Sequence, residues 1–532
     1  MVAAAAVSAS AIAFGLYARV EWPWLALGWI GLTPWLAVLD RTPSWRGALL
    51  VGLLMCEGFV LAVFGWFPSA IQNYTGAPWA AALLVVLLVA PLLEPQFLVF
   101  ALVRYLARRR AGRERMAWNV ALVGACAYVG TEWAVPKLFG DTLGHGLYAS
   151  ALMRQAADIA GAPGLTFVLI IANECVFAAG TTLASSGPSG RPVVRALVPA
   201  AAVAVLVFGV LAYGSVRYTQ LRDAAQAGTP VTAGIVQADI SHYERLAVEL
   251  GTFDAVRKIL EAHFALSADA LARGSLDLLV WPETVYPTTF GAPKSKEGAD
   301  FDHEIGAFVN TAGVPLVFGA YDAEGDDEFN AAVFLQPMAD RSATFDTYRK
   351  ASLFPLTERV PAVFDSGFVR RWLPWLGTWK AGKGPAVVPL TLRDGRTLLV
   401  APLICYDALV PGHAIAAVRR GAEMIVTLSN DSWFTYGSVP RLILLISAFR
   451  SIETRRPQIR ATNTGISALI TPTGDFVDTI GVHRRGALVG TVWPQRGART
   501  LMLELGDWFG PGASACGAAL LLFLRPPKSG RG

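Results

Sequence analysis

A cysteine ends a long apolar run of the chain. The segment LLVAPLICYD, residues 398–407, is aliphatic up to Cys405, and polar side chains begin directly after it. A free cysteine is often a small buried hydrophobe. A thiol at the end of a buried strand is also placed to act as a nucleophile once a base or a cation favours its thiolate. Cys405 alone leaves both interpretations open.

Two other strand-like runs end on groups that would activate such a thiol. Glu283 ends the run LDLLVWPE, and Lys350 ends the run SATFDTYRK. A carboxylate can remove the thiol proton, and an ammonium group can stabilise the oxyanion that forms when sulfur attacks a carbonyl. Glu358 follows eight residues after Lys350 and could orient it. The set predicts acyl transfer with Cys405 as nucleophile, Glu283 as base and Lys350 as oxyanion stabiliser.

The elements that must position these residues alternate between strands and helices. Several strand candidates are apolar throughout, which indicates a sheet covered on both faces and a layered α/β domain. Polar residues follow the strands, as Asn430 and Asp431 do, where open α/β sheets place their sites. We expect strands at 232–240, 276–284, 314–322, 329–337, 342–350, 397–407, 422–431 and 465–475, and helices at 243–273, 300–312, 413–420 and 440–456.

Composition indicates a membrane protein. Hydrophobic residues make up 54% of the 532 residues, charged residues only 16%, and the mean hydropathy is +0.45, too apolar for an ordinary soluble chain. Eight stretches approach the ~20 residues that span a bilayer, at 2–18, 22–39, 46–66, 79–103, 117–135, 161–185, 193–215 and 508–524. The chain therefore divides into a membrane domain at 1–216, a globular domain at 217–507, and a last span with its tail at 508–532.

Basic residues in short loops predict the orientation. The loop RYLARRRAGRERM, residues 104–116, holds six arginines against one glutamate, and such loops stay in the cytoplasm. Seven spans then carry the globular domain to the opposite side, which in a bacterium is the periplasm. The net charge of +5 reflects this topology and gives no indication of nucleic-acid binding. The six histidines show no metal-ligand spacing, and no cofactor motif is found.

Four motifs resemble those of the carbon–nitrogen hydrolase, or nitrilase, superfamily. They are WPET at 281–284, YRKASLFPLTERVP at 348–361, LICYD at 403–407 and SNDSWF at 429–434. The resemblance implies a Glu–Lys–Cys triad on an αββα sandwich. With eight predicted spans and the loop KLFGDTLGHGLYAS at 137–150, nearly the whole chain resembles the membrane branch of that superfamily, the apolipoprotein N-acyltransferases.

This resemblance implies a two-step reaction in the bacterial inner membrane. Cys405 would take an acyl chain from a phospholipid such as phosphatidylethanolamine, and the thioester would then acylate the α-amino group of the diacylglyceryl-cysteine of an apolipoprotein. By resemblance Glu283, Lys350 and Cys405 form the triad. The supporting residues would be Glu358, Tyr406, Asp407 and Asn330. The resemblance implies no cofactor and no metal, and we expect a monomer.

The chain departs from the family pattern at three places. Asp407 stands where the family usually has a glutamate, and Thr357 and Arg359 alter the loop around Glu358. Leu442 and Ile443 stand where the family usually has a Gln-His pair. Two alternatives therefore stay open: a membrane-anchored amidase or nitrilase that passes its thioester to water, and a catalytically impaired paralogue that binds lipoproteins as a scaffold.

Overall fold

The computed structural model describes most of the chain. The described residues are 2–111, 116–135, 137–184, 191–225, 228–240, 243–338, 343–360, 365–373, 376–432 and 438–524. The chain forms two compact units, one made of Met1–Thr219 with Asp507–Gly532 and the other of Gln220–Gly506. The basic loop is described only in part, and the C-terminal tail RPPKSGRG lies outside the described residues.

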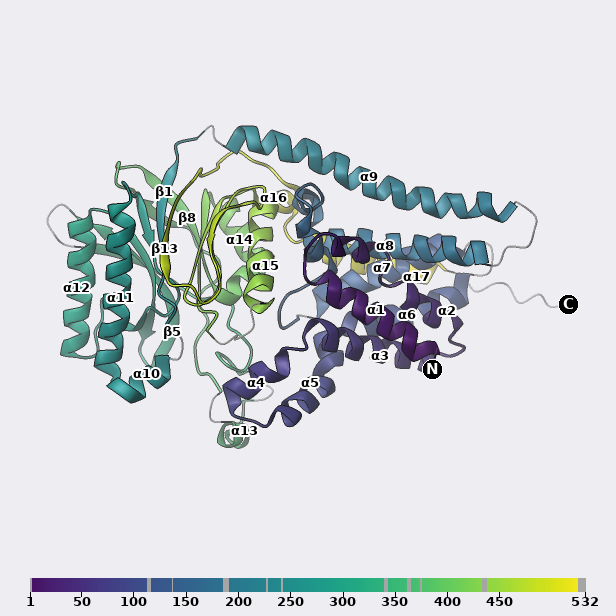
Figure 1. The fold of residues 1–532 in the computed structure, drawn as a ribbon, viewed down its shortest axis with the longest axis horizontal. Helices are drawn as coiled ribbons and strands as arrows, with labels where there is room; N and C mark the ends of the chain where they lie inside the picture. Colours follow the sequence, from purple (N-terminus) through teal and green to yellow (C-terminus); the bar gives the residue numbers. More distant parts are fainter. Residues whose placement is uncertain are drawn as a thin grey trace. The chain divides into compact units, whose positions relative to one another are not determined.

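The unit of Gln220–Gly506 contains two sheets (Figure 1). The first has the strand order β13-β1-β2-β4-β5-β6, with β3 paired to β4, and the second has the order β12-β11-β10-β9-β8-β7. The strands of the first sheet are β1 (Val231–Gln237), β2 (Leu278–Val280), β3 (Tyr286–Thr289), β4 (Leu316–Glu324), β5 (Asp327–Pro337), β6 (Ala343–Arg349) and β13 (Gly486–Val492). Those of the second are β7 (Val388–Thr391), β8 (Thr397–Ile404), β9 (Met424–Ser429), β10 (Gln458–Thr462), β11 (Ser467–Ile470) and β12 (Phe476–Ile480).

Helices cover the outer face of each sheet. The first sheet is covered by α11 (Thr252–Ala272) and α12 (Lys296–Ala312), and the second by α14 (Pro411–Arg419) and α15 (Ser438–Thr454) (Figure 1). One buried cluster joins side chains of the two sheets, including Val280 and Val400. Other clusters join each sheet to its helices. The predicted αββα sandwich is therefore confirmed.

The long helix predicted at 243–273 is wrong in one respect. It is two helices, α10 (Tyr243–Leu250) and α11, because Gly251 between them has φ +88°, a left-handed conformation that ends a helix. Strands β3, β7, β10, β12 and β13 were not predicted from the sequence. Several of them are short or carry no clear alternation of apolar and polar residues.

The other unit is helical. Its helices are α1 (Val2–Tyr17), η1 (Trp24–Trp29), α2 (Thr33–Arg41), α3 (Trp45–Val63), α4 (Phe67–Thr75), α5 (Trp79–Leu93), α6 (Pro95–Ala111), α7 (Met116–Ala134), η2 (Leu143–Ala149), η3 (Met153–Ala156), α8 (Ala157–Ala184), α9 (Arg191–Ala225) and α17 (Phe509–Phe523). Most of these segments are apolar, and their close packing buries aromatic side chains such as Trp35, Phe97 and Phe100.

Three described helices are long and apolar enough to cross a membrane, and a fourth span arises if the bent pair α5 and α6 counts as one. The two halves of this pair meet at an angle of 48°. The predicted span 22–39 is not one helix: residues 30–32 form a turn between η1 and α2, and Pro34, which has no N–H to donate, stands in the first turn of α2. Helices α1 and α17 are apolar but shorter. The count of eight spans remains a prediction.

Candidate active site

Glu283 lies just beyond β2, and hydrogen bonds fix both of its carboxylate oxygens. Oε1 accepts a bond of 2.7 Å from the Asn330 amide on β5, and Oε2 accepts one of 2.7 Å from the backbone N–H of Asn430. The backbone of Glu283 passes close to Gly319 of β4. A Cβ atom at Gly319 would lie 2.5 Å from the Cα of Glu283. Only glycine fits there. The side chain of Glu283 is 5% exposed.

Lys350 directly follows β6, and its ammonium group lies between two carboxylates. Nζ is 3.1 Å from Glu283 Oε1 and 2.7 Å from Glu358 Oε1, and the lysine side chain is 1% exposed. The backbone N–H of Lys350 donates to the carbonyl of Asn330 at 2.8 Å. Asn330 therefore positions both the base candidate, through its side chain, and the lysine, through its main chain. Glu358 is held in turn by the backbone N–H of Phe354 at 2.7 Å.

Cys405 begins a 3₁₀ turn, η4 (Cys405–Leu409), directly after β8. Its φ is +47°, a left-handed conformation that is uncommon and strained for a residue with a side chain. Cys405 is in no disulfide, and the residue is partly buried. The ring of Tyr406 packs edge-on against Phe354, with centroids 5.2 Å apart. A sharp turn between strand and helix thus presents the sulfur at the end of the sheet.

Burial and charge set the protonation of these groups. Burial raises the pKa of the Cys405 thiol, the Glu283 charge raises it further, and the Lys350 charge opposes them. Burial also raises the pKa of Glu283, against the lowering effect of Lys350. Burial alone would lower the pKa of Lys350, but the Glu283 and Glu358 charges outweigh it and hold that pKa well above its usual range. The resting site therefore has a protonated thiol, a charged lysine and a carboxylate with raised basicity.

Asp407 ties the lysine loop to the cysteine turn. Its carboxylate is fully buried and accepts backbone N–H bonds from Ser352 at 2.6 Å, Ala351 at 3.2 Å and Ile404 at 3.0 Å. It also accepts the hydroxyl of Tyr348 at 3.0 Å. Asp407 therefore fixes Lys350 and Cys405 relative to each other, and its short side chain suffices for this contact.

The other departures are of two kinds: Thr357 and Arg359 flank Glu358, and Leu442 and Ile443 lie on a helix. The backbone of Arg359 closes the turn around Leu356, and its side chain is exposed, while Thr357 is half-buried. Leu442 and Ile443 belong to α15, where Ile443 is buried. The end of the segment 429–434 lies outside the described residues.

Sequence reasoning missed part of the site. Asn430 was noted as a polar residue at a strand end, but its backbone contact with Glu283 was not expected. Tyr348 lies in β6 two residues before Lys350, a spacing at which extended chain turns both side chains the same way, and this was the one signal for its role. Ser352 Oγ lies 2.8 Å from His413 Nε2, and this contact between residues 61 positions apart could not be predicted from residue types alone.

Comparison with known proteins assigns the globular unit to a family. The family model described as carbon–nitrogen hydrolase matches residues 232–499, half of the chain. The chain belongs to the carbon–nitrogen hydrolase family. A second model, described as the apolipoprotein N-acyltransferase N-terminal domain, matches residues 9–175. The region that matches the carbon–nitrogen hydrolase model is thus preceded by a helical region that matches a second family model.

Full-length relatives share both regions. An apolipoprotein N-acyltransferase of Geobacter metallireducens is 27% identical over 508 residues, covering 94% of this chain and 90% of that protein. One of Ralstonia nicotianae is 28% identical and covers 96% and 90%. The solved structure of an amidase from Nesterenkonia sp. is 19% identical, covers 51% of this chain and 93% of its own, and has a TM-score of 0.36. The predicted resemblance to the apolipoprotein N-acyltransferases is confirmed.

Proposed function

We propose that this chain is an integral membrane N-acyltransferase that moves an acyl chain from a phospholipid to the α-amino group of diacylglyceryl-modified apolipoproteins. One observation carries the proposal. A region matching the apolipoprotein N-acyltransferase N-terminal domain precedes a carbon–nitrogen hydrolase domain in which a buried lysine joins two carboxylates beside a free thiol. We propose Glu283, Lys350 and Cys405 as the catalytic triad.

In the first step Glu283 takes the proton of the Cys405 thiol as sulfur attacks the ester carbonyl of the phospholipid. The Lys350 ammonium stabilises the oxyanion, as a preorganised charge does in a site that excludes water. The carbon–oxygen bond of the ester then breaks, and Glu283 returns the proton to the released lysophospholipid hydroxyl. A thioester on Cys405 remains.

In the second step the neutral α-amino group of the acceptor attacks the thioester carbonyl. Glu283 accepts a proton from this amine, the carbon–sulfur bond breaks, and the proton passes to the departing thiol. An amide forms and the free enzyme returns. Because both substrates carry acyl chains that cost ~0.8 kcal/mol per CH₂ to withdraw from lipid, the reaction belongs at the bilayer surface.

We further propose phosphatidylethanolamine as the donor, a monomer as the active form, and a bacterial inner-membrane location with the catalytic domain in the periplasm. The orientation is supported by the arginine-rich loop at 104–116, which positive-inside topology places in the cytoplasm. To test the orientation, a cysteine is introduced at an exposed position of the globular unit. In spheroplasts whose inner membrane is intact, it should react with a membrane-impermeant thiol reagent if the unit faces the periplasm.

The test of function is acyl transfer by the full-length protein in phosphatidylethanolamine vesicles. With a diacylglyceryl-cysteinyl peptide, the expected product is the peptide carrying one further amide-linked acyl chain, and Cys405→Ala should form none. Release of free fatty acid without acylated peptide would instead establish the hydrolase alternative. Peptide binding without either product would favour the scaffold.

A further inference from the structure

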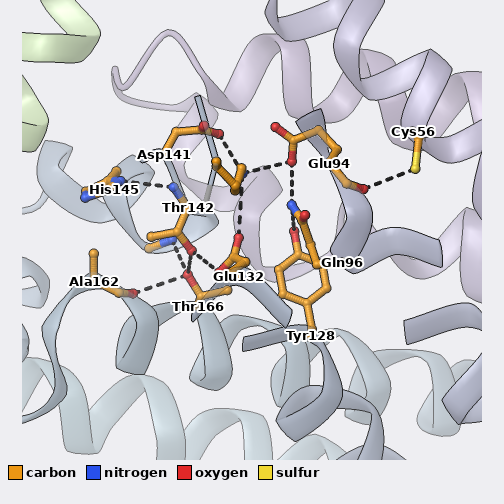
Figure 2. Close-up of polar contacts among 12 residues, drawn as sticks. Cys56, Glu94, Gln96, Tyr128, Glu132, Asp141, Thr142, His145, Ala162 and Thr166 are labelled. Atoms are coloured by element: carbon orange, nitrogen blue, oxygen red, sulfur yellow. Dashed lines mark hydrogen bonds and ion pairs between the residues drawn. The ribbon is translucent and has the colours of Figure 1, made fainter. Parts of the chain in front are cut away.

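A buried polar cluster lies in the helical unit, where α5 ends and α6 begins. We call it the Lys137 cluster, and it consists of Glu94, Gln96, Glu132, Lys137 and Asp141. Lys137 Nζ is 2.9 Å from Glu94 Oε2, 3.1 Å from Asp141 Oδ2 and 3.8 Å from Glu132 Oε1. Figure 2 shows Glu94, Glu132 and Asp141 converging on one point from different sides. Burying ionisable side chains in an apolar helical unit costs free energy. Such residues are therefore candidates for a functional site.

The cluster holds more negative than positive charge. Among the described residues, Lys137 is the one cationic side chain within 4.0 Å of these three carboxylates. The side chains of Glu94, Glu132 and Asp141 are only 1%, 6% and 12% exposed, so water screens their charges poorly. A second positive species would therefore be favourable in the cluster.

The deficit is greatest at Glu132. Glu94 lies between the C-terminus of α5 and the N-terminus of α6, whose dipoles act on its charge in opposite senses, and its carboxylate accepts from both the Gln96 amide and Lys137. Glu132 lies in the last turn of α7, where the helix dipole disfavours a carboxylate. The hydroxyl of Thr142 donates to Glu132 Oε2 at 2.7 Å, whereas Oε1 is buried and receives no hydrogen bond from the residues that the structure describes, with Lys137 Nζ 3.8 Å away.

A second acceptor lies in the same cluster and is not itself acidic. The Gln96 side chain is fully buried, and its amide nitrogen contacts Glu94 Oε2, with the Tyr128 hydroxyl 3.5 Å away. Its carbonyl oxygen receives no hydrogen bond within the described part of the chain. Tyr128 and Glu132 are both in α7, four residues apart, and therefore lie on the same face of that helix. The Gln96 amide, which is near Tyr128, faces this side of α7. Two buried acceptors thus lack donors beside an excess of negative charge.

We propose that Glu132, supported by Gln96 and Asp141, binds the primary ammonium group of a diacylated lipid substrate. This inference rests on the proposed function, because both substrates of that reaction carry such a group: the headgroup of phosphatidylethanolamine and the N-terminal cysteine of the acceptor. Lys137 already occupies the centre of the cluster as an ammonium ion, so the surroundings suit N–H donors. Asp141 is the most exposed of the three carboxylates and marks the side from which a headgroup approaches.

A metal ion fits the cluster less well. Across the described ranges, no group of three or more His, Cys, Asp or Glu side chains has the geometry of a metal site. An extra proton shared by the carboxylates is the remaining alternative, and it predicts no selectivity among lipids.

The experiment measures lipid binding on a Cys405→Ala background, so that it needs no turnover. Full-length protein in detergent is titrated with phosphatidylethanolamine, phosphatidylglycerol and phosphatidylcholine, and bound lipid is counted by native mass spectrometry. We expect phosphatidylethanolamine to be preferred, because phosphatidylglycerol has no amine and phosphatidylcholine has no N–H donor. Glu132→Gln should reduce that preference by about tenfold, the loss of one charge-assisted hydrogen bond. Glu57→Gln, in α3 and outside the cluster, should leave it unchanged.

A second arm identifies the source of the ammonium group. A diacylglyceryl-cysteinyl peptide with a free α-amino group is compared with its N-acetylated form, and Glu132→Gln should abolish the difference if the acceptor is the ligand. Thermal unfolding checks that the variants fold, and Glu132→Asp, which retracts the carboxylate by one methylene, should weaken the preference if the Gln variant does not fold. Unchanged selectivity for both ligands in the folded variants would overturn the proposal, and it would do so whether or not the chain transfers acyl groups.

Discussion

The ammonium nitrogen of Lys350 lies 3.1 Å from the carboxylate oxygen Oε1 of Glu283, with side chains only 1% and 5% exposed. The proposed base and the proposed oxyanion stabiliser are thus a single buried ion pair, and Glu358 completes it from the other side. A change at either partner therefore alters both the charge balance of the site and the stability of the fold.

Replacement of the lysine should destabilise the protein strongly. Lys350→Met leaves the buried Glu283 and the partly buried Glu358 without a cation, and breaking a buried pair costs about 3–5 kcal/mol. Thermal unfolding of the detergent-solubilised protein should show a large fall in midpoint. Lys380→Met is the control, because the Lys380–Asp327 pair is 56% and 50% exposed and such pairs contribute only about 0–1 kcal/mol. Equal small shifts in both variants would contradict the buried pair.

Loss of the base should slow acylation more than it alters the fold. Glu283→Gln keeps the shape of the side chain but cannot accept the thiol proton, so the acylation rate should fall about 100- to 10,000-fold. Single-turnover transfer from phosphatidylethanolamine measures this rate. The exposed Glu297, changed to Gln, serves as the matched control. A rate equal to that of the control would remove Glu283 from the role of base.

The acylation rate should depend on pH through Glu283. Because burial raises the pKa of Glu283 above the ordinary 4.5, the acid limb should lie at a higher pH than that of a free glutamate. The rate falls as pH decreases through this pKa, since the protonated acid cannot act as a base. The same raised pKa contributes folding stability below pH 4.5 that is lost as pH rises through the folded-state value. An acid limb at or below 4.5 would contradict this environment.

Loss of the Asp407 carboxylate should lower the stability of the fold more than loss of its hydrogen-bond partner, the Tyr348 hydroxyl. Asp407→Ala leaves three backbone N–H groups and the Tyr348 hydroxyl without their acceptor, and each unpaired buried group costs about 1–3 kcal/mol. Tyr348→Phe removes one bond and no acceptor, so its cost should be about 1 kcal/mol. Thermal unfolding and acylation rate should rank the two variants in this order. The reverse order would show that Asp407 does not join the lysine loop to the cysteine turn.

The sequence located the reactive groups because each stands at the end of a strand-like run, which is apolar before Glu283 and Cys405 and mixed in polarity before Lys350. Glu283, Lys350 and Cys405 follow β2, β6 and β8, and the end of such a run can be read from the residues themselves. The contacts that fix them could not be read in the same way. Asn430 is 147 residues from Glu283 in the chain, and its contact is made by a backbone N–H that any residue type could supply.

Hydropathy was a weaker guide in the helical unit. It measures apolar content over a window and does not see a break in the helix, so 22–39 was predicted as one span although η1 and α2 divide it. Glu132 falls within the predicted span 117–135, where a carboxylate is costly, and the sequence alone shows this. Its neighbours Glu94, Lys137 and Asp141 could not be recognised in this way, because they come from separate segments that only the packed helices bring together.

The most direct test is the intact mass of the purified protein after incubation with phosphatidylethanolamine, beside Cys405→Ser. The account predicts a mass increase equal to one acyl chain, removed by hydroxylamine and absent from the serine variant when treated in the same way. The peptide that carries the thioester should contain Cys405. A folded protein that acquires no acyl group, or one acylated at another residue, would contradict the assignment of Cys405 as the nucleophile.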